Sequence, residues 1–335
     1  MSQLLWTQKQ DIGPAARCNA AMVYVSGQGR IVLFGGQTAD NSTTGLSNDT
    51  WEWDGENWTQ YADIGPAPRS LHAMTYDSSR GRIVLFGGIA GNFISRLNDT
   101  WEWDGEAWTQ MADTGPAPRS AAAMAYDSKR GRALLFGGYD GGTSFGDTWT
   151  WDGTSWTEEQ DTGPPARSGH GLDYDSGRDR LVLFGGVSVS TKVTTVTVRD
   201  SGLSGAFGGT HTEQQSVMQS QFLNDTWEYD GAVWTRVGDT GPAPRSGCGL
   251  VYDGKTLLLF GGRDQSNTFK DTWQWNGKHW TERQDIGPAA RAFAGMAFDS
   301  ARQRMVIFGG SGVPTVYGDT WEASERPLAA PPMPK

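Results

Sequence analysis

The sequence contains little cysteine, little histidine and no long hydrophobic run. Its 335 residues include 2 cysteines and 4 histidines, and no apolar stretch approaches the length of a membrane-spanning segment. Helix-length amphipathic stretches are also absent, which argues against a helical fold. The two cysteines, Cys18 and Cys248, lie in distant parts of the repeat pattern described below, so we expect two small buried thiols and no disulfide.

Positive charge is also scarce. The formal net charge is −10, which argues against nonspecific binding to nucleic acid or to a bilayer, so neither is a predicted partner. Most of this acidity recurs at fixed repeat positions, and for that reason it does not indicate a basic partner. The first expected strand begins within a few residues of Met1, leaving no room for a signal peptide, and the simplest expectation is a cytoplasmic protein.

Tryptophan and glycine, by contrast, are abundant and ordered. All 16 tryptophans belong to a pattern that recurs six times, each copy running from an arginine through Phe-Gly-Gly and Asp-Thr-Trp to a last Trp-Thr or an equivalent strand. Successive Phe-Gly-Gly triplets are 52, 50, 48, 76 and 48 residues apart, a period typical of repeat architectures. The triplets begin at Phe34, Phe86, Phe136, Phe184, Phe260 and Phe308.

Each copy contains four short segments with strand character. They are bounded by Gly, Pro, Asp or Asn, and Asp-Gly turns such as Asp54-Gly55 join the third segment to the fourth, so each copy predicts a four-stranded antiparallel sheet. A sheet with large aromatic residues on both faces cannot bury them alone, whereas six such sheets packed around an axis can.

The Gly-Gly doublets, the spaced aromatics Trp53 and Trp58 and the fifty-residue period together resemble the kelch repeat, over about residues 3–322. This resemblance implies an all-β, six-bladed kelch-type β-propeller with four antiparallel strands per blade. It implies less about function, because kelch propellers include protein-binding modules, sugar-processing enzymes and oxidases.

The repeats predict one propeller domain over residues 3–322. After Glu322 no second tryptophan strand follows, so we expect the N-terminal segment 4–8 to complete the last blade and close the ring. The proline-rich residues 323–335 are expected to be a disordered tail. The expected blades are 17–60, 69–110, 119–158, 167–236, 245–282, and 291–322 with 4–8.

An arginine recurs at the start of every innermost strand, and strand parity places all six at one mouth of the channel. Arginine suits the bidentate capture of carboxylate, sulfate or phosphate, so the ring could bind an anionic ligand. The structural alternative is that these residues tie loops together through the repeat aspartates, and strict repetition favours it. The six are Arg17, Arg69, Arg119, Arg167, Arg245 and Arg291.

Departures from repetition are a better indication of function. Two positions after each arginine the residues vary widely, and so do those immediately after each Gly-Gly, so these two rings could line an asymmetric pocket. Ordinary drift at exposed positions is the alternative. The candidate ligand-binding residues from these rings are Asn19, Leu71, Phe293, Tyr139 and Arg263.

Three further positions could carry chemistry. His72, His170 and Cys248 share one level of the repeat, which suggests a metal site, but their parity favours packing between blades, and no metal or other cofactor is predicted. Asp173 replaces small or apolar residues found in the other blades and is a weak candidate for a general base, although a structural hydrogen bond is the simpler role. His211 is a second weak catalytic candidate.

The longest departure is an insertion in the fourth blade, at residues 187–222. Between Gly186 and Asp225 lie 38 residues, against 8 to 12 in the other blades. Alternating valines predict an extended strand, followed by a glycine-rich turn and a returning arm, on the same face as the arginines. It could be a lid over the mouth, or an arm for another protein or for self-association.

We therefore expect a binding propeller that recognises a polar or anionic small molecule, or a partner segment, at the mouth on this face. The alternative is an enzyme of lyase, isomerase or oxidase type acting on a small polar substrate there. The iron motif of the similar plant nitrile-specifier proteins is absent, because Pro14 and Pro244 stand four residues before the cysteines. A copper site like that of galactose oxidase is poorly supported by four histidines, and no motif selects sialate-epimerase-like chemistry.

Overall fold

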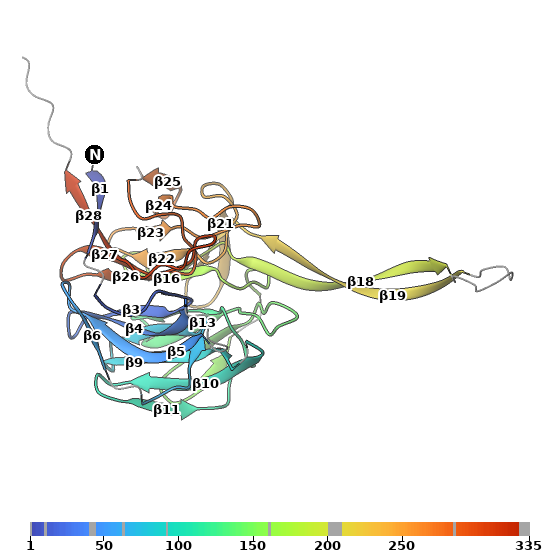
Figure 1. Ribbon diagram of the computed structural model, residues 1–335, viewed down its shortest axis with the longest axis horizontal. Coiled ribbons are helices and arrows are strands. Elements are labelled where there is room, and N and C mark those ends of the chain that lie inside the picture. Colours follow the sequence, from blue (N-terminus) through green and yellow to red (C-terminus); the bar gives the residue numbers. More distant parts are fainter. Residues whose placement is uncertain are drawn as a thin grey trace, which may run out of the picture.

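The computed structural model is a six-bladed β-propeller (Figure 1). Six antiparallel sheets surround a central channel, and the described residues contain no helix, which confirms the predicted all-β fold class. The structure describes residues 2–9, 12–39, 45–61, 64–91, 93–159, 162–199, 210–283 and 286–327.

The first three blades follow one another along the chain, each running from an inner to an outer strand. Blade 1 has β3 (Ala21–Val25), β4 (Arg30–Thr38), β5 (Leu46–Trp53) and β6 (Trp58–Gln60), with the short β2 (Arg17–Cys18) pairing to the end of β4. Blade 2 has β8 (Ala73–Asp77), β9 (Arg82–Ala90), β10 (Ser95–Trp103) and β11 (Trp108–Ala112), with β7 (Arg69–Ser70). Blade 3 has β12 (Ala123–Asp127), β13 (Arg132–Phe136), β14 (Thr148–Trp151) and β15 (Trp156–Glu158).

The last three blades include the insertion and the ring closure. Blade 4 has β16 (Gly171–Asp175), β17 (Arg180–Phe184), β20 (Thr226–Tyr229) and β21 (Trp234–Gly238), with β18 (Val187–Arg199) and β19 (Thr210–Phe222) between its second and third strands. Blade 5 has β22 (Gly249–Tyr252), β23 (Leu257–Phe260), β24 (Thr272–Trp275) and β25 (Trp280–Arg283). Blade 6 has β26 (Gly295–Asp299), β27 (Arg304–Phe308), β28 (Thr320–Pro327) and β1 (Ser2–Gln8).

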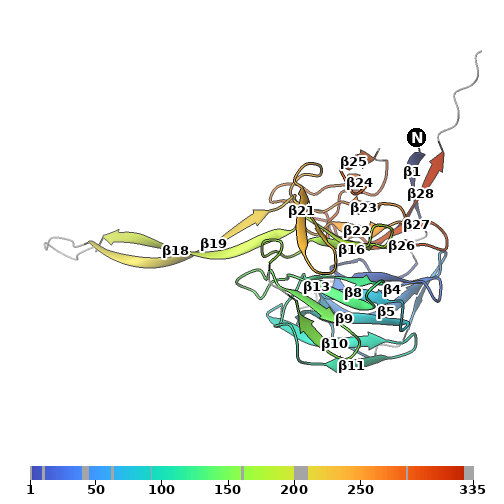
Figure 2. The same ribbon diagram turned by 180° about the vertical axis from the view of Figure 1, so that it is seen from behind.

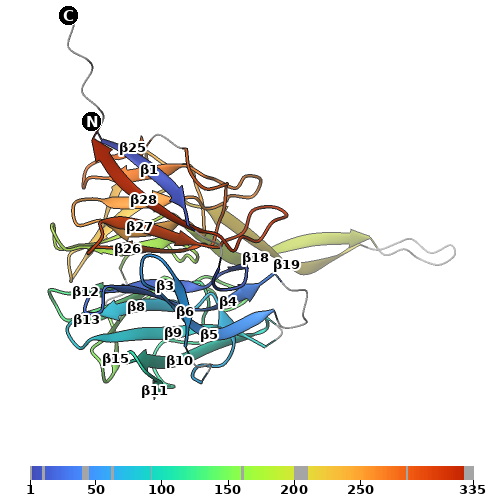
Figure 3. The ribbon, with the colours of Figure 1, turned by 60° about the vertical axis from the view of Figure 1, so that its left-hand side comes forward.

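The N-terminal strand closes the ring, as the sequence predicts. β1 pairs with β28 from Ser2 opposite Pro327 to Gln8 opposite Trp321, so blade 6 joins both ends of the chain (Figure 3). The expectation of a disordered tail from residue 323 is wrong for residues 323–327. These residues are the end of β28 and pair with β1. Residues 328–335 lie outside the described part of the chain.

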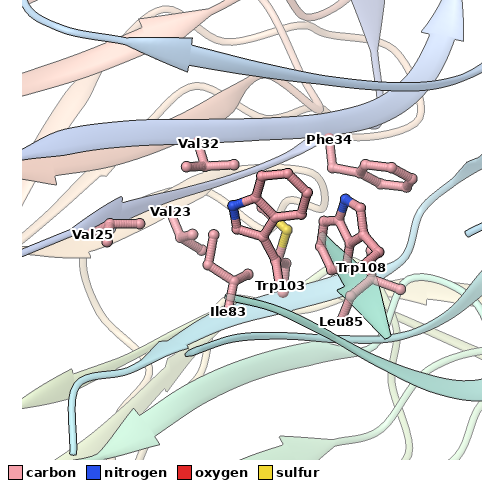
Figure 4. Packing of buried hydrophobic residues seen from close by; sticks show 9 residues of the cluster. Val23, Val25, Val32, Phe34, Ile83, Leu85, Trp103 and Trp108 are labelled. Carbon is pink, nitrogen blue, oxygen red and sulfur yellow. The ribbon is translucent and has the colours of Figure 1, made fainter. Parts of the chain in front are cut away.

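Aromatic residues fill the seams between blades. In the seam of blades 1 and 2, Trp108 packs against Phe34 with ring centroids 5.0 Å apart, in a cluster that also contains Val32 and Leu85 (Figure 4). The indole nitrogen of Trp108 donates to Thr50 Oγ1 of blade 1 at 3.0 Å. Trp108 therefore combines a large buried apolar surface with a satisfied polar atom, and this contact holds blades 1 and 2 together.

Candidate functional site

The two ends of the propeller differ, and we name them by their loops. Face A carries the loops between blades and those between the second and third strands. Face B carries the loops between the first and second strands and those between the third and fourth. Inner strands begin at face A and end at face B. The arginines and the insertion were predicted to share a face, and both belong to face A.

The six repeat arginines are held inside their own blades. In each blade the guanidinium group binds the Asp-Thr-Trp aspartate of the same blade in a bidentate manner, with N–O distances of 2.5 to 2.9 Å. Arg69, for example, also donates to the carbonyl groups of Ala67 and Gly87, each at 3.0 Å. Four of its five N–H groups are thereby used.

This burial corrects the expected position of the arginine ring. Arg17, the most exposed of the six, is only 2% exposed, so these side chains do not line the channel mouth. Burial would raise the pKa of Asp99, but the hydrogen bonds and positive charge of Arg69 outweigh it and hold that pKa below its usual value. The arginines occupy the structural role that the sequence left as an alternative.

The mouth on face A is instead built from the residues two positions after each arginine. Their backbone groups form a closed ring of six N–H···O=C hydrogen bonds around the axis, each linking one blade to the next at 2.7 to 2.9 Å. All six adopt a left-handed backbone conformation, which is uncommon for residues other than glycine. The ring residues are Asn19, Leu71, Ala121, Gly169, Gly247 and Phe293.

The side chains at this mouth are asymmetric. A pocket of about 150 Å³ includes Asn19, Leu71 and Phe293 in its lining. The ring of Phe293 lies over Gly247, which has no side chain to compete for that space. Arg263 stacks on Phe293 from the neighbouring blade, with 5.3 Å from guanidinium carbon to ring centroid. The structure thus brings three of the predicted residues to the mouth, with Arg263 beside them.

Tyr139 lies in a second aromatic contact on the same face. Its ring is half-buried and the guanidinium carbon of Arg96 lies 5.6 Å from its centroid. Tyr139 also bridges to Ser120 and Ser144 through its backbone. Among its partners only Arg96 comes from a different blade, so Tyr139 belongs to the rim between blades 2 and 3 rather than to the mouth pocket.

His72, His170 and Cys248 pack into three different seams. His72 meets Phe34 edge-on and His170 meets Phe136 in the same way, while Cys248 belongs to the cluster between blades 4 and 5. Burial lowers the pKa of both histidines to about 3 and raises that of Cys248 to about 11, so these groups are neutral near pH 7. Within the described ranges, no group of three or more His, Cys, Asp or Glu side chains could hold a metal ion.

The insertion forms a two-stranded antiparallel ribbon, which we call the arm (β18 and β19). Its strands are 13 residues each and pair from Val187 opposite Phe222 to Arg199 opposite Thr210. The arm extends well away from the propeller (Figures 1 and 2). The base of the arm is anchored to the propeller, where Ser144 of blade 3 exchanges two hydrogen bonds of 3.0 Å with the backbone of Val189. Such a ribbon is an arm rather than a lid over the mouth.

Of the two weak catalytic candidates, Asp173 lies in the channel wall, whereas the side chain of His211 is outside the described part of the structure. The carboxylate of Asp173 accepts hydrogen bonds from the backbone N–H groups of Tyr174 at 2.8 Å and of Tyr252 in blade 5 at 2.6 Å. Burial raises its pKa to about 6. The second of these hydrogen bonds links the inner strands of blades 4 and 5, and Asp173 lines a different space from the face A mouth.

That space is a cavity of about 450 Å³ inside the channel toward face B. The sequence did not predict this cavity, because the departures from repetition point to the arginine face. A signal was present: an aromatic residue recurs near the end of every inner strand, as in Tyr76 and Tyr126.

The sheet topology and the arginine–aspartate pair repeated in every blade together define a kelch-type β-propeller. Residues 1–186 match the model of the family described as the KLHDC2/KLHL20/DRC7 Kelch-repeats domain, and the chain belongs to this kelch-repeat family. A comparison with curated proteins finds no match. No helix in the described ranges is long and apolar enough to cross a membrane; the cytoplasmic location stays a prediction.

Proposed function

We propose that this protein is a protein-binding propeller that contacts its partner through face A and the arm. Kelch propellers are typically protein-binding scaffolds. The arm is the observation that carries the proposal, because an isolated two-stranded ribbon is at best marginally stable in water. A partner that covers the arm would supply the missing contacts.

The side chains of the arm suit such a contact. Val193 and Met218 are 55% and 56% exposed and lie on one face of the ribbon, where they are diagonal neighbours: Val193 is opposite Ser216, and Met218 is opposite Thr191. Val196 and Val217 are 39% and 41% exposed and lie on the other face. The remaining positions are mostly Ser, Thr and Gln, so the arm offers apolar anchors among hydrogen-bonding groups, a pattern suited to β-strand addition by a partner.

The loops of face A add further exposed apolar residues. Ile12, Ile64 and Ile286 occupy the same position in three consecutive inter-blade loops and are 83% to 84% exposed. Phe93 and Ile94, in the loop between β9 and β10, are also exposed. Exposed apolar side chains in several loops of one face support a protein partner there.

A polar or anionic small molecule at the mouth has less support. The mouth pocket of about 150 Å³ is smaller than the roughly 300 to 1,000 Å³ of ordinary ligand pockets, and the six arginine side chains are committed to aspartates. The enzyme alternative also has less support at this mouth, because His72 and His170 pack against Phe34 and Phe136 in the seams beside it, with pKa values near 3.

The test uses a photo-crosslinking amino acid at Val193 and, as a matched control, at the exposed Glu106 on face B. We expect a protein crosslinked at Val193 but not at Glu106, and direct binding of that purified partner to weaken at least about tenfold in a Val193→Ser, Met218→Ser variant. If the crosslinked partner is a second copy of the chain, sedimentation must show a dimer that the variant lacks. Equal crosslinking at both sites would contradict the proposal.

A further inference from the structure

The cavity toward face B has aromatic walls. It occupies about 450 Å³ inside the central channel, within the roughly 300 to 1,000 Å³ range of small-molecule sites. Its aromatic residues come one from each blade, so they form a collar around the axis. They are Tyr24, Tyr76, Tyr126, Tyr174, Tyr252 and Phe298.

Deeper in the channel the lining becomes aliphatic. One residue per blade, two positions before each collar aromatic, forms a second ring, and beyond it the channel continues toward face A as smaller spaces of about 170 and 150 Å³. A ligand entering from face B would therefore contact the aromatic side chains first and the aliphatic ring next. The second ring consists of Met22, Met74, Met124, Leu172, Leu250 and Met296.

Asp173 is the one carboxylate among the residues that line this cavity, and no Lys, Arg or His side chain lines it. Its two oxygens each accept one backbone hydrogen bond, from Tyr174 and Tyr252, and each retains a further lone pair. In the described part of the chain no cation forms an ion pair with it. An ionised carboxylate that is partly buried without a counter-ion is unfavourable until a cation reaches it.

The hydrogen bond to Tyr252 does not by itself explain why this position is acidic. The same position in the other five blades is occupied by small or apolar residues, and those seams close without a carboxylate. Repeated architecture therefore does not require Asp173. The equivalents are Val23, Thr75, Ala125, Val251 and Ala297.

We propose that the face B cavity binds an organic cation, with its ammonium group against Asp173 and its apolar body within the tyrosine collar. The carboxylate would supply a charge-assisted hydrogen bond, and the tyrosine rings would supply cation–π and apolar contacts. The net charge of −10 favours the approach of a cation over that of an anion. This site is separate from the protein-binding surface proposed on face A.

The protonation state of Asp173 gives the proposal a pH signature. Burial raises its pKa to about 6, partly offset by the two backbone hydrogen bonds. The titratable group that acts on it is Asp175, whose charge also raises the pKa and which is itself paired with Arg178. The phenol of Tyr174 donates instead to Asp179. A bound cation stabilises the ionised carboxylate, so cation binding must weaken when Asp173 is protonated.

Three probes of similar size test the charge requirement: phenethylammonium, 2-phenylethanol and 3-phenylpropionate. At pH 7.5 we expect calorimetry or ligand-observed NMR to show phenethylammonium binding at least about tenfold more tightly than the alcohol, and no binding of the carboxylate. Asp173→Asn should remove that preference. The control Asp140→Asn changes net charge equally in an exposed turn of face A, and should leave it unchanged.

A pH series on the unmodified protein keeps the test decisive if Asp173→Asn folds poorly. Phenethylammonium affinity should fall severalfold between pH 7.5 and 4.5, while that of the neutral alcohol stays constant. Equal binding of cation and alcohol, a flat pH series, absence of cation binding, or an equal loss in Asp140→Asn would each overturn the proposal.

Discussion

The bidentate Arg69–Asp99 pair, which we call a clamp, and the arm differ in how they relate to the repeated blade. The clamp recurs in all six blades, buries its guanidinium group and satisfies both partners. The arm occurs once, touches the propeller only near its base and exposes Val193 and Met218. Contacts that every blade repeats stabilise the ring of blades. A segment found in one blade is not needed for that ring and can bind a partner.

Two aspartates, one repeated in every blade and one not, differ in the same way in their pKa shifts. Asp99 lies within the clamp, where Arg69 lowers its pKa despite burial. Asp173 lies in the channel without a cation, where burial raises its pKa to about 6. The repeated carboxylate is therefore stabilised in its ionised form, and the unrepeated one in its protonated form.

Removing the ring closure should have the largest effect on the scaffold. Deleting residues 2–8 removes β1, the outer partner of β28. It also removes the buried Leu4 and the contact of Trp6 with Phe260, whose ring centroids are 5.2 Å apart. We expect loss of cooperative unfolding by circular dichroism, with recovery on adding a peptide of residues 1–9. A truncated protein as stable as the full chain would show that the ring needs no closure.

Breaking one clamp should be the next largest effect. Arg69→Ala leaves the partly buried Asp99 without its ion-pair partner and empties the buried site of the guanidinium group, so the free energy of unfolding should fall by about 3–5 kcal/mol in urea denaturation. The control is Arg82→Ala, which removes a partly exposed arginine 3.4 Å from Asp104 and should cost less than about 1 kcal/mol. Similar losses in both variants would contradict a structural role specific to the clamp.

The two classes of aspartate should give opposite pH dependence. Asp173 binds a proton more tightly folded than unfolded, so its contribution is greatest below about pH 4 and is lost as the pH rises through about 6. The stability of the unmodified protein relative to Asp173→Asn should fall by roughly 1–2 kcal/mol over that window. For Asp99 the sign is reversed: its contribution is present above pH 4 and decreases in more acidic solution. A constant difference between pH 4 and 6 would refute the assignment to Asp173.

The arm should contribute least to stability. Val193→Ser with Met218→Ser changes two side chains that are each more than half exposed, so the free energy of unfolding should shift by less than about 0.5 kcal/mol. The matched pair Val32→Ser and Leu85→Ser, in the core between blades 1 and 2, should prevent folding. A large loss from the arm variant would mean that the arm supports the propeller.

The sequence predicted the fold because its signals are local and repeated. Phe-Gly-Gly, Asp-Thr-Trp and the Asp-Gly turns each mark a strand end, and six copies remove the ambiguity of any one of them. The closing strand was predictable too, since blade 6 lacks its last tryptophan strand and Trp6 supplies it. The strand character of residues 323–327 was missed because their pairing with β1 depends on closure of the ring rather than on local composition.

The candidate site was less predictable because it depends on where side chains point. Arginine parity indicated the correct end of the blade, but only the structure shows Arg69 turned inward onto Asp99. The ring of backbone hydrogen bonds through Asn19 and Phe293 has no sequence signature, since residues from glycine to phenylalanine adopt it. The face B collar recurs in the sequence as Tyr76 and its equivalents, but an aromatic residue near a strand end does not by itself distinguish a channel lining from core packing.

The most direct test of the division between scaffold and recognition is removal of the arm. A two-residue Asn-Gly turn joining Ser190 to Gln219, which already pair, preserves the anchored base. The account predicts an unfolding free energy within about 1 kcal/mol of the full chain, together with loss of binding to the partner crosslinked at Val193. Unfolding of the propeller, or undiminished binding of that partner, would contradict it.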